Sequence, residues 1–260
     1  MPEGLEAEIW TRALRVTEGR TISVGWVDGR VAPAGFVPSV VGAQISTVRR
    51  AGKVILLDTD GPTIGLHLGM TGRIVVDGRS VIERLEYASG RDDPSWDRLR
   101  VSTTPPAGPA GEAAIRLNDP RRLGHVSLDA DLSHLGVDYA AVTRRRLALA
   151  LHGRRRAIKP TLLDQTVVAG LGNLCADEVL WWAGIDPHRS AGSLPDEEIG
   201  RLSSAIRRRM SAMLRLGGST TGVLSPTVRA VCPPCERDGA PLRREVIAGR
   251  TAVWCPAHQR

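Results

Sequence analysis

The spacing of apolar residues changes between about residues 128 and 136 of this 260-residue chain, and that change constrains the fold more than any other feature. Before it, from about residue 21, short β-branched runs alternate with turn residues such as Asp60-Gly61-Pro62 and Asp77-Gly78. The clearest predicted strands span residues 45–48, 54–57 and 74–76. Short strands joined by tight turns are typical of antiparallel sheets, so we expect a β-sandwich here.

Amphipathic helices are predicted on both sides of this strand-rich part. Residues 4–18 present one apolar face, and Gly19 follows as a stop signal. The face consists of Leu5, Ile9, Ala13 and Leu14. A further helix is predicted over residues 142–151, which are rich in Leu, Ala and Arg, and another over residues 177–183, which follow a Gly-Leu-Gly-Asn turn.

A long helix is predicted near the C-terminal end. Ser193-x-x-Asp196, with Pro195 in the first turn, has the form of a helix start, and Gly217-Gly218 has the form of a helix end. Its apolar stripe consists of Ile199, Leu202, Ile206, Met210 and Met213. We therefore expect an α+β chain in which an N-terminal helix and antiparallel sandwich precede a helical part.

The order of these patterns predicts three parts. An N-terminal part covers residues 1–135, a helical part covers 136–222, and a small module covers 223–260. Residues 103–111 are rich in proline and glycine, so we expect a loop there.

Cysteine and histidine are paired in the last 29 residues. Cys232-x2-Cys235 is followed by 19 residues and then by Cys255-x2-His258. Two close pairs of such ligands suit one tetrahedral structural Zn²⁺ per chain, which would supply the folding energy of a module too small to bury a core. The alternative is an accidental cysteine cluster with a surface histidine. Cys175 lies far away in the sequence, and we expect it to be buried.

The charge balance favours a polyanionic partner. Lysine and arginine number 35 against 28 acidic residues, which gives a formal net charge of +7. The segment between the two metal-ligand pairs carries Arg237, Arg243, Arg244 and Arg250, which suit contacts with phosphates. A solvated basic loop is the alternative. No secretory signal and no apolar run of membrane-spanning length is evident, so we expect no membrane and a cytoplasmic location.

The chain begins Met1-Pro2-Glu3, which has a chemical consequence if Met1 is removed, as the small second residue permits. Pro2 would then carry a weakly basic secondary amine. Such an amine attacks the anomeric carbon of a deoxyribose and forms an iminium. The tripeptide alone is a weak signal.

Further motifs occur in order along the chain, and together they are specific. They are Pro2-Glu3-x-x-Glu6, Gly52-Lys53, His67-Leu68-Gly69-Met70-Thr71-Gly72, Asp119-Pro120-Arg121-Arg122, Ile158-Lys159-Pro160-x-Leu162-x-Asp164-Gln165, Gly170-Leu171-Gly172-Asn173, Ala176-Asp177-Glu178 and the Cys/His pairs. In their order and approximate spacing the chain resembles the formamidopyrimidine-DNA glycosylase and endonuclease VIII family nearly end to end. The resemblance implies a catalytic N-terminal sandwich, a helix–two-turn–helix domain and a zinc finger.

The resemblance also implies catalytic roles. Pro2 corresponds to the Schiff-base nucleophile and Glu3 to the acid that protonates the opening sugar and then shuttles protons. Lys53 corresponds to a lysine that reaches the lesion's phosphate and assists elimination. Arg250 corresponds to the finger arginine that grips phosphate and assists a second elimination.

The DNA-contacting residues are implied in the same way. They are Glu6, His67, Met70, Arg121, Leu123, Lys159 and Asn173. Met70 is similar to the wedge that fills the gap after the base leaves the stack, and Arg121 to the residue that faces the orphaned partner base. Lys159 and Asn173 are similar to residues near the DNA backbone, and Glu6 to a carboxylate that shapes the lesion pocket.

Several positions depart from the family pattern. Leu123 stands where the oxidised-purine branch usually has Phe, Cys175 replaces a common Tyr, and His258 replaces a Cys ligand. Residues 219–231 are a short segment where that branch carries a long loop over the everted base. The short segment resembles the endonuclease VIII branch, whereas residues 67–72 are closer to the purine branch.

These observations predict a monomeric, bifunctional DNA glycosylase and AP lyase acting on duplex DNA that contains damaged bases or abasic sites. We expect an endonuclease VIII-like or diverged lesion preference over 8-oxoguanine. A catalytically silent, damage-binding paralogue is one alternative. An RNA-binding zinc protein is another, and it explains the charge but not the proline terminus.

Overall fold

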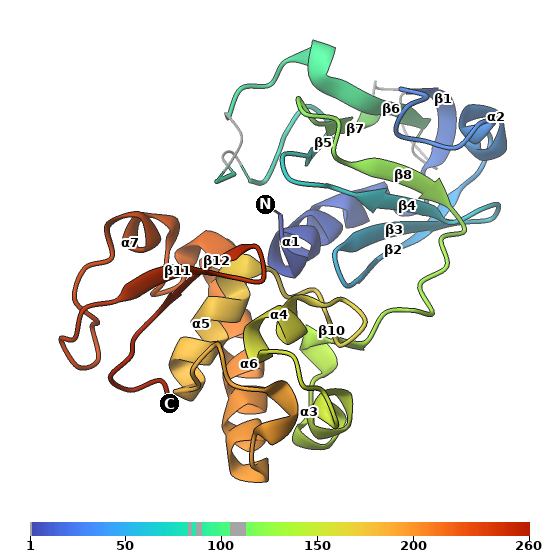
Figure 1. Cartoon of the computed structure of the whole chain (residues 1–260). Coiled ribbons are helices and arrows are strands. Elements are labelled where there is room, and N and C mark those ends of the chain that lie inside the picture. The colour runs from blue at the N-terminus through green and yellow to red at the C-terminus, as the bar shows by residue number, and fades with distance from the viewer. Residues whose placement is uncertain (1, 83–84, 87–89, 105–112) are drawn as a thin grey trace. The chain divides into compact units, whose positions relative to one another are not determined.

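A computed structural model describes residues 2–82, 85–86, 90–104 and 113–260 (Figure 1). The chain divides into two compact units. Unit 1 comprises Met1–Pro2 and Glu6–Leu132, and unit 2 comprises Glu3–Leu5 and Ser133–Arg260. Met1 and most of the predicted loop 103–111 lie outside the described residues.

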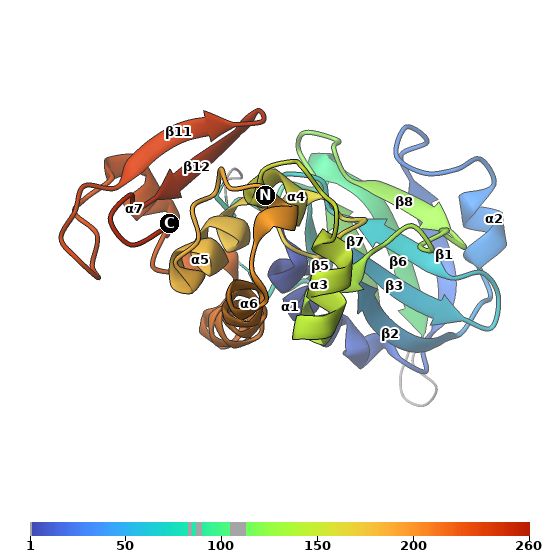
Figure 2. The same ribbon diagram turned by 60° about the horizontal axis from the view of Figure 1, so that its bottom comes forward.

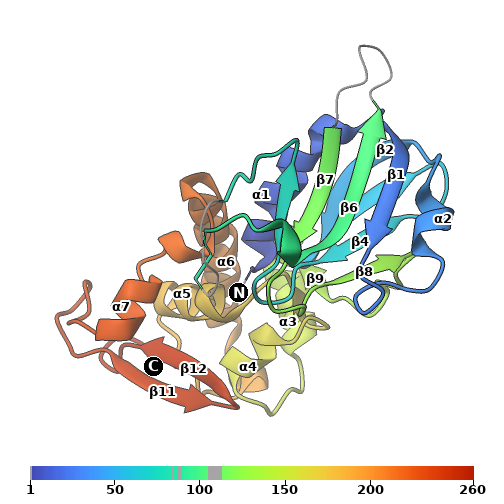
Figure 3. The same ribbon diagram turned by 90° about the horizontal axis from the view of Figure 1, so that it is seen from above.

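Unit 1 contains two four-stranded sheets in which every neighbouring pair is antiparallel, as predicted. The first sheet has the order β1-β6-β7-β5, and Figure 3 shows β1, β6 and β7 side by side. Its strands are β1 Thr21–Val27, β5 Arg73–Val76, β6 Asp97–Thr104 and β7 Ala113–Asn118. The second sheet has the order β2-β3-β4-β8. Its strands are β2 Ile45–Ala51, β3 Val54–Thr59, β4 Ile64–His67 and β8 His125–Leu128.

One apolar core joins the two sheets of unit 1. Inward-facing residues such as Ile22, Ile55 and Leu117 belong to a single buried cluster. Helix α1 (Gly4–Leu14) adds Trp10 to this cluster and continues as the 3₁₀ turn Arg15–Thr17, close to the predicted helix over 4–18. The short helix α2 (Phe36–Val40) packs beside β1 and was not predicted from the sequence.

Unit 2 is mainly helical. Its first helices are α3 (Arg144–Leu151), α4 (Ile158–Leu163) and α5 (Asn173–Ala183). The predicted helix over 142–151 begins two residues later because the Thr143 side chain caps it by accepting the N–H of Arg146. Helix α5 begins four residues before the predicted start of 177. The two-residue parallel pair β9 (Val137–Asp138) and β10 (Val168–Ala169) is too short to leave a periodic signal.

The long helix α6 (Asp196–Leu216) confirms the predicted apolar stripe, because all five stripe residues are buried. Its start differs from the prediction. Pro195 occupies the N-cap without a side-chain hydrogen bond, and Ser193 belongs to the preceding 3₁₀ turn Ala191–Ser193. Its end agrees with the prediction, since Gly217 adopts φ 113°, a left-handed conformation open to glycine.

The C-terminal part of unit 2 is a helix followed by a hairpin (Figure 2). Helix α7 (Pro226–Val231) precedes β11 (Arg243–Ile247) and β12 (Arg250–Trp254), which pair antiparallel. Ala248 and Gly249 form the turn with φ 48° and 78°, as a type I′ turn requires. Among the described residues, none of the helices combines the length and the hydropathy that a bilayer-spanning segment requires.

Candidate active site and metal centre

The Glu3 side chain is buried and held by backbone donors. Its carboxylate accepts hydrogen bonds from the N–H groups of Gly172 (2.9 Å), Leu174 (2.8 Å) and Cys175 (3.2 Å). These N–H groups lie at the start of α5, where the helix has no internal acceptors for them and the helix dipole favours an anion. The cradle therefore fixes both carboxylate oxygens in place.

The residues that flank Glu3 explain why the chain passes so close to this helix end. Gly4 donates a hydrogen bond to the carbonyl of Gly170 at 2.8 Å, and a Cβ on Gly4 would lie only 2.7 Å from that oxygen. Only glycine permits this approach. Pro2 is buried. Cys175, expected to be buried, is fully buried.

A buried ion cluster supports the hairpin that carries Arg250. Lys159 is fully buried, and its ammonium group pairs with Asp177 at 2.6 Å. Asp177 also pairs with Arg229. Both cations donate to the carbonyl of Thr251, Lys159 at 2.6 Å and Arg229 at 3.0 Å. Arg250 itself is exposed beside the hairpin turn, next to this anchored carbonyl.

The burial of Lys159 changes the role inferred from the sequence. Desolvation lowers the pKa of Lys159, and Arg229 lowers it further, while Asp177 opposes both effects. A fully buried ammonium group has no exposed donor for a DNA phosphate, so the structure places Lys159 inside unit 2. Asn173, the first residue of α5, is partly exposed. Its Oδ1 atom is buried and has no hydrogen-bond partner within the described part of the chain.

In unit 1, Asp119 joins the two loops that carry the predicted DNA-contacting residues. Its carboxylate accepts the N–H groups of Leu123 at 2.7 Å and Gly124 at 2.8 Å, and the Thr71 hydroxyl also donates to it. Gly69 has φ 58°, and a Cβ there would lie 2.3 Å from the Leu123 backbone. The segments 67–72 and 119–124 are therefore locked together.

The side chains on these two loops differ in exposure. Met70 is partly buried, whereas Arg121 and Leu123 are exposed. Leu123 is 44 % exposed, so its apolar side chain is accessible from solvent. Glu6, in the first turn of α1, is buried.

His67 and Lys53 lie near one another in unit 1. The His67 ring stacks on that of His125 with a centroid separation of 4.7 Å, and its Nδ1 accepts the N–H of Gly69 at 3.2 Å. Burial lowers the pKa of His67 to about 4, and His125 and Lys53 add to this effect. His67 is therefore a neutral imidazole near pH 7. Lys53 is partly buried in the two-residue turn between β2 and β3, after Gly52 at φ 57°.

A cluster of potential metal ligands lies at the base of the hairpin. The ligand atoms of Cys235, Asp238, Cys255 and His258 all lie within 4.8 Å of one another. Two thiolates, an imidazole and a carboxylate match the ligand types that bind a tetrahedral divalent metal. Cys232, a ligand predicted from the sequence, lies outside this cluster, and its Sγ is 3.6 Å from the carbonyl of Arg229. The predicted set is thus brought together except for Cys232.

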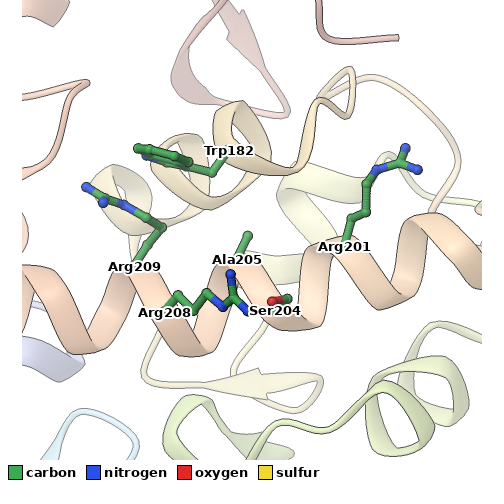
Figure 4. Close-up of a pocket in the computed structure, with 6 residues that line it drawn as sticks. All are labelled: Trp182, Arg201, Ser204, Ala205, Arg208 and Arg209. Atoms are coloured by element: carbon green, nitrogen blue, oxygen red, sulfur yellow. The ribbon is translucent and has the colours of Figure 1, made fainter.

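A basic pocket of about 360 Å³ lies between α5 and α6, and Figure 4 shows the residues that line it. In it the Arg209 guanidinium extends over the ring of Trp182, 4.3 Å from its centroid. Trp182 lies nine residues along α5 from Asn173, and a rise of 1.5 Å per residue separates the two by roughly 14 Å. The pocket is therefore remote from the Glu3 cradle.

Sequence reasoning missed the contacts of four residues that build these sites. Arg229 lies in the short helix α7, which has no periodic signal. Gly172 and Asp119 belong to recognised motifs, but their contacts with Glu3 and with the 67–72 loop link residues far apart in the sequence. Asp238 has a signal that could have been found, since Cys235-x2-Asp238 repeats the spacing of Cys255-x2-His258.

Two family models match this chain. The formamidopyrimidine-DNA glycosylase N-terminal domain matches residues 1–126, and the formamidopyrimidine-DNA glycosylase H2TH domain matches residues 135–225. Curated relatives are similar over nearly their whole length. The formamidopyrimidine-DNA glycosylase of Halorhodospira halophila is 35% identical, with all of both chains covered. That of Paracoccus denitrificans is 31% identical, with 99% of this chain and 96% of the relative covered.

Solved structures share the fold. The Lactococcus lactis formamidopyrimidine-DNA glycosylase bound non-covalently to DNA containing an AP site superposes with a TM-score of 0.81 at 25% identity, covering 99% of each chain. The same enzyme in complex with DNA containing an oxidised pyrimidine superposes with a TM-score of 0.81 at 24% identity, covering all of both chains. The chain therefore belongs to the formamidopyrimidine-DNA glycosylase family and is a base-excision-repair enzyme, a DNA N-glycosylase with AP lyase activity.

Proposed function

We propose that this enzyme excises damaged bases from duplex DNA through a Schiff base on Pro2 and then cleaves the abasic site by β,δ-elimination. The observation that carries the proposal is the Glu3 cradle. Three backbone N–H groups fix the carboxylate of the residue that directly follows the nucleophile. A general acid and base needs this kind of fixed position to act on a sugar bonded to its neighbour.

The proposed reaction uses the amine of Pro2 after Met1 is removed. The amine adds to C1′ of the sugar, the base departs with a proton, and the ring opens to an iminium as Glu3 protonates the ring oxygen. Loss of a C2′ proton then expels the 3′ phosphate, and a second elimination expels the 5′ phosphate. Water finally hydrolyses the imine and releases the enzyme.

Charged and wedge residues support this chemistry in the proposal. Lys53 and the exposed Arg250 bind phosphates of the damaged strand and assist elimination. Asn173 and His67 contact the DNA, and the buried Glu6 shapes the lesion pocket. Met70 fills the space left by the everted base, with Arg121 and Leu123 on the orphaned-base side. Lys159 acts indirectly, by holding the Thr251 carbonyl next to Arg250.

The metal cluster fits a structural zinc ion, one per chain. Cys235, Cys255 and His258 supply donors that zinc prefers, and a bound metal would add folding energy to this small module. Three functional parts are assigned on this basis: catalysis to residues 1–135, backbone binding to the helix–two-turn–helix part 136–222, and phosphate gripping to the finger 223–260.

The lesion preference proposed here is endonuclease VIII-like or diverged, with weak action on 8-oxoguanine. Residues 219–231 support it, because they are folded onto α5. The Leu224 N–H donates to Glu178 at 3.0 Å, and Arg229 pairs with Asp177. A segment held in this way is poorly suited to close over an everted purine.

The decisive experiment is borohydride trapping on a duplex with one abasic site. Protein lacking Met1 should form a covalent adduct, and Pro2→Gly should lose most of it while retaining affinity for the duplex. A form that retains Met1 serves as the matched control, because its amine lies one residue away from Pro2. Equal trapping of the Met1-containing form would overturn Pro2 as the nucleophile, and binding without any trapping would indicate a silent damage-binding protein.

A further inference from the structure

The separations within the metal cluster match a tetrahedral site that includes Asp238. Bonds of about 2.3 Å to sulfur and about 2.0–2.1 Å to nitrogen or oxygen give ligand–ligand edges of roughly 3.3–3.8 Å. Cys235 Sγ lies 3.7 Å from His258 Nδ1, and Cys255 Sγ lies 3.3 and 3.4 Å from the Asp238 oxygens. The Asp238–His258 distance of 2.7 Å is shorter than such an edge because the two side chains form a direct hydrogen bond, so these two ligand atoms would have to move apart to share a metal.

The backbone presents Asp238 and His258 on equivalent turns. The N–H of Gly239 donates to the carbonyl of Cys235 at 2.8 Å, and the N–H of Gln259 donates to the carbonyl of Cys255 at 3.1 Å. Each turn therefore closes four residues after its cysteine. It directs the residue just before the N–H donor towards the cysteine thiol, and this residue is Asp238 in the first turn and His258 in the second. In the first turn Gly239 adopts φ 73°, which glycine allows without strain.

Cys232 belongs to a different local structure. It is the C-cap of α7 with φ 49°, its N–H donates to the carbonyl of Val228 at 2.8 Å, and its Sγ is directed at the carbonyl of Arg229. The end of the helix thus sets the direction of its side chain.

The hydrogen bonds of His258 indicate whether Asp238 is a metal ligand or a carboxylate that only orients the imidazole ring. A metal-binding imidazole usually donates its remote N–H to a carbonyl or carboxylate. His258 Nε2 lies 3.2 Å from the carbonyl of Trp181, so this carbonyl takes the remote proton. Asp238 contacts Nδ1, the nitrogen that also faces Cys235, so Asp238 lies on the metal side of the ring.

We propose that Asp238, in place of Cys232, is the fourth ligand, so that the site holds its metal through two thiolates, one imidazole and one carboxylate. The inference rests on the proposed zinc site. With Asp238 as the ligand, the segment between the two ligand pairs is 16 residues long instead of 19, and Cys232 is a free thiol at the end of α7.

Metal content of matched variants tests the assignment. Protein purified without chelator should retain one zinc per chain in Cys232→Ala, as in the wild type. Removal of an outer-shell partner lowers metal affinity by roughly 10–100-fold. Asp238→Ala removes a ligand itself, so a chelator competition should show a loss of zinc affinity of about 100-fold or more. Asp238→Cys should restore binding, which separates a lost ligand from a failure to fold. Loss of zinc in Cys232→Ala with retention in Asp238→Ala would overturn the assignment.

Cobalt substitution gives a second readout that is independent of DNA cleavage. The near-ultraviolet thiolate-to-cobalt band grows with the number of bound thiolates, so the wild type should show two-thiolate intensity, unchanged in Cys232→Ala and higher in Asp238→Cys. An intensity that falls in Cys232→Ala would also overturn the proposal. A wild type that takes up neither zinc nor cobalt would overturn the metal site itself, whereas failure of borohydride trapping with intact metal binding would affect only the proposed catalysis.

Discussion

The N–H of Gly172 donates to Glu3 Oε2 at 2.9 Å, and a Cβ on Gly172 would lie 2.2 Å from Cδ of the same glutamate. The backbone of Gly172, at φ −121° and ψ −167°, is one that alanine also adopts. A methyl group here would therefore displace the Glu3 carboxylate without straining the chain. A substitution at Gly172 therefore tests the position of the Glu3 carboxylate without changing the carboxylate itself.

Gly172→Ala should slow abasic-site cleavage by about 100-fold, the effect expected when a catalytic group is misplaced by about 1 Å. Single-turnover cleavage at saturating enzyme measures this, with circular dichroism to verify folding. Gly200→Ala is the matched control, because its new Cβ would meet only the Arg144 side chain at 3.6 Å or more. A wild-type rate in Gly172→Ala would show that the cradle does not position a catalytic acid.

Asp177→Asn should destabilise the protein by about 3–5 kcal/mol in free energy of unfolding. The substitution leaves Lys159 and Arg229 buried without their shared carboxylate, and an uncompensated buried charge is costly. Urea unfolding measures the change. Glu197→Gln breaks an ion pair with Arg201 in which Glu197 is 87 % exposed, and it should cost less than about 1 kcal/mol. Similar losses in both variants would contradict a special role for the buried cluster.

His67 should titrate with a pKa of about 4, because burial, His125 and Lys53 all disfavour its protonated form. As pH falls, the unfolded chain takes up the proton first, near the ordinary value of 6.5. The stability contributed by His67 is therefore complete above pH 6.5 and is lost between 6.5 and about 4. NMR titration of the His67 ring measures the pKa, and His125→Asn should raise it. A measured value at or above 6.5 would refute the buried, neutral imidazole.

The sandwich and the long helix α6 were predictable because their signals are local. Alternating β-branched runs gave the strands, and a five-residue apolar stripe gave α6. The roles of Pro2, Glu3 and Arg250 were inferred from motifs that resemble those of the family, and they stay predictions. The burial of Lys159 was not predictable, because its partner Asp177 is close only in the folded chain.

Two close pairs of ligands in the sequence predicted a metal site, but the choice between Cys232 and Asp238 could not be made from residue types. The softness of the ligand atom favours the Cys232 thiol over the Asp238 carboxylate. The spacing Cys-x2-Cys also fits a metal-binding turn as well as the spacing Cys-x2-Asp does. The helix that ends at Cys232 decides its side-chain direction, and six-residue helices such as α7 leave too short a pattern to predict.

Arg250 and Lys159 should differ in the salt dependence of DNA binding. Arg250→Ala should reduce the slope of log K against log salt by roughly one unit, because it removes the phosphate contact proposed for this residue. Lys159→Met should leave the slope unchanged even where it weakens binding, since its ammonium group is buried. Fluorescence anisotropy over a range of salt concentrations measures both slopes. A slope reduced equally by Lys159→Met would place that lysine on the DNA.

Lesion preference is the remaining prediction, and it depends on two features. Residues 219–231 fold as the 3₁₀ turn Ser219–Thr221 and helix α7, and Leu123 is 44 % exposed where an aromatic ring could stack on a base. A lost base–aromatic stack is worth about 1–3 kcal/mol, or about one to two decades in rate. We therefore expect slow excision of 8-oxoguanine and faster action on ring-opened purines, oxidised pyrimidines and abasic sites.

Side-by-side cleavage of duplexes carrying 8-oxoguanine, thymine glycol, dihydrouracil or an abasic site measures this preference. The lyase step should be least affected, because it needs Pro2, Glu3 and an open sugar but no pocket for a base. Leu123→Phe is the informative variant: it restores a stacking ring on an exposed loop and should raise 8-oxoguanine excision while leaving abasic-site cleavage unchanged. Equal turnover of 8-oxoguanine and the abasic site by the wild type would refute the argument from the short segment. No gain in Leu123→Phe would remove stacking as the cause and leave the folded segment 219–231 as the determinant.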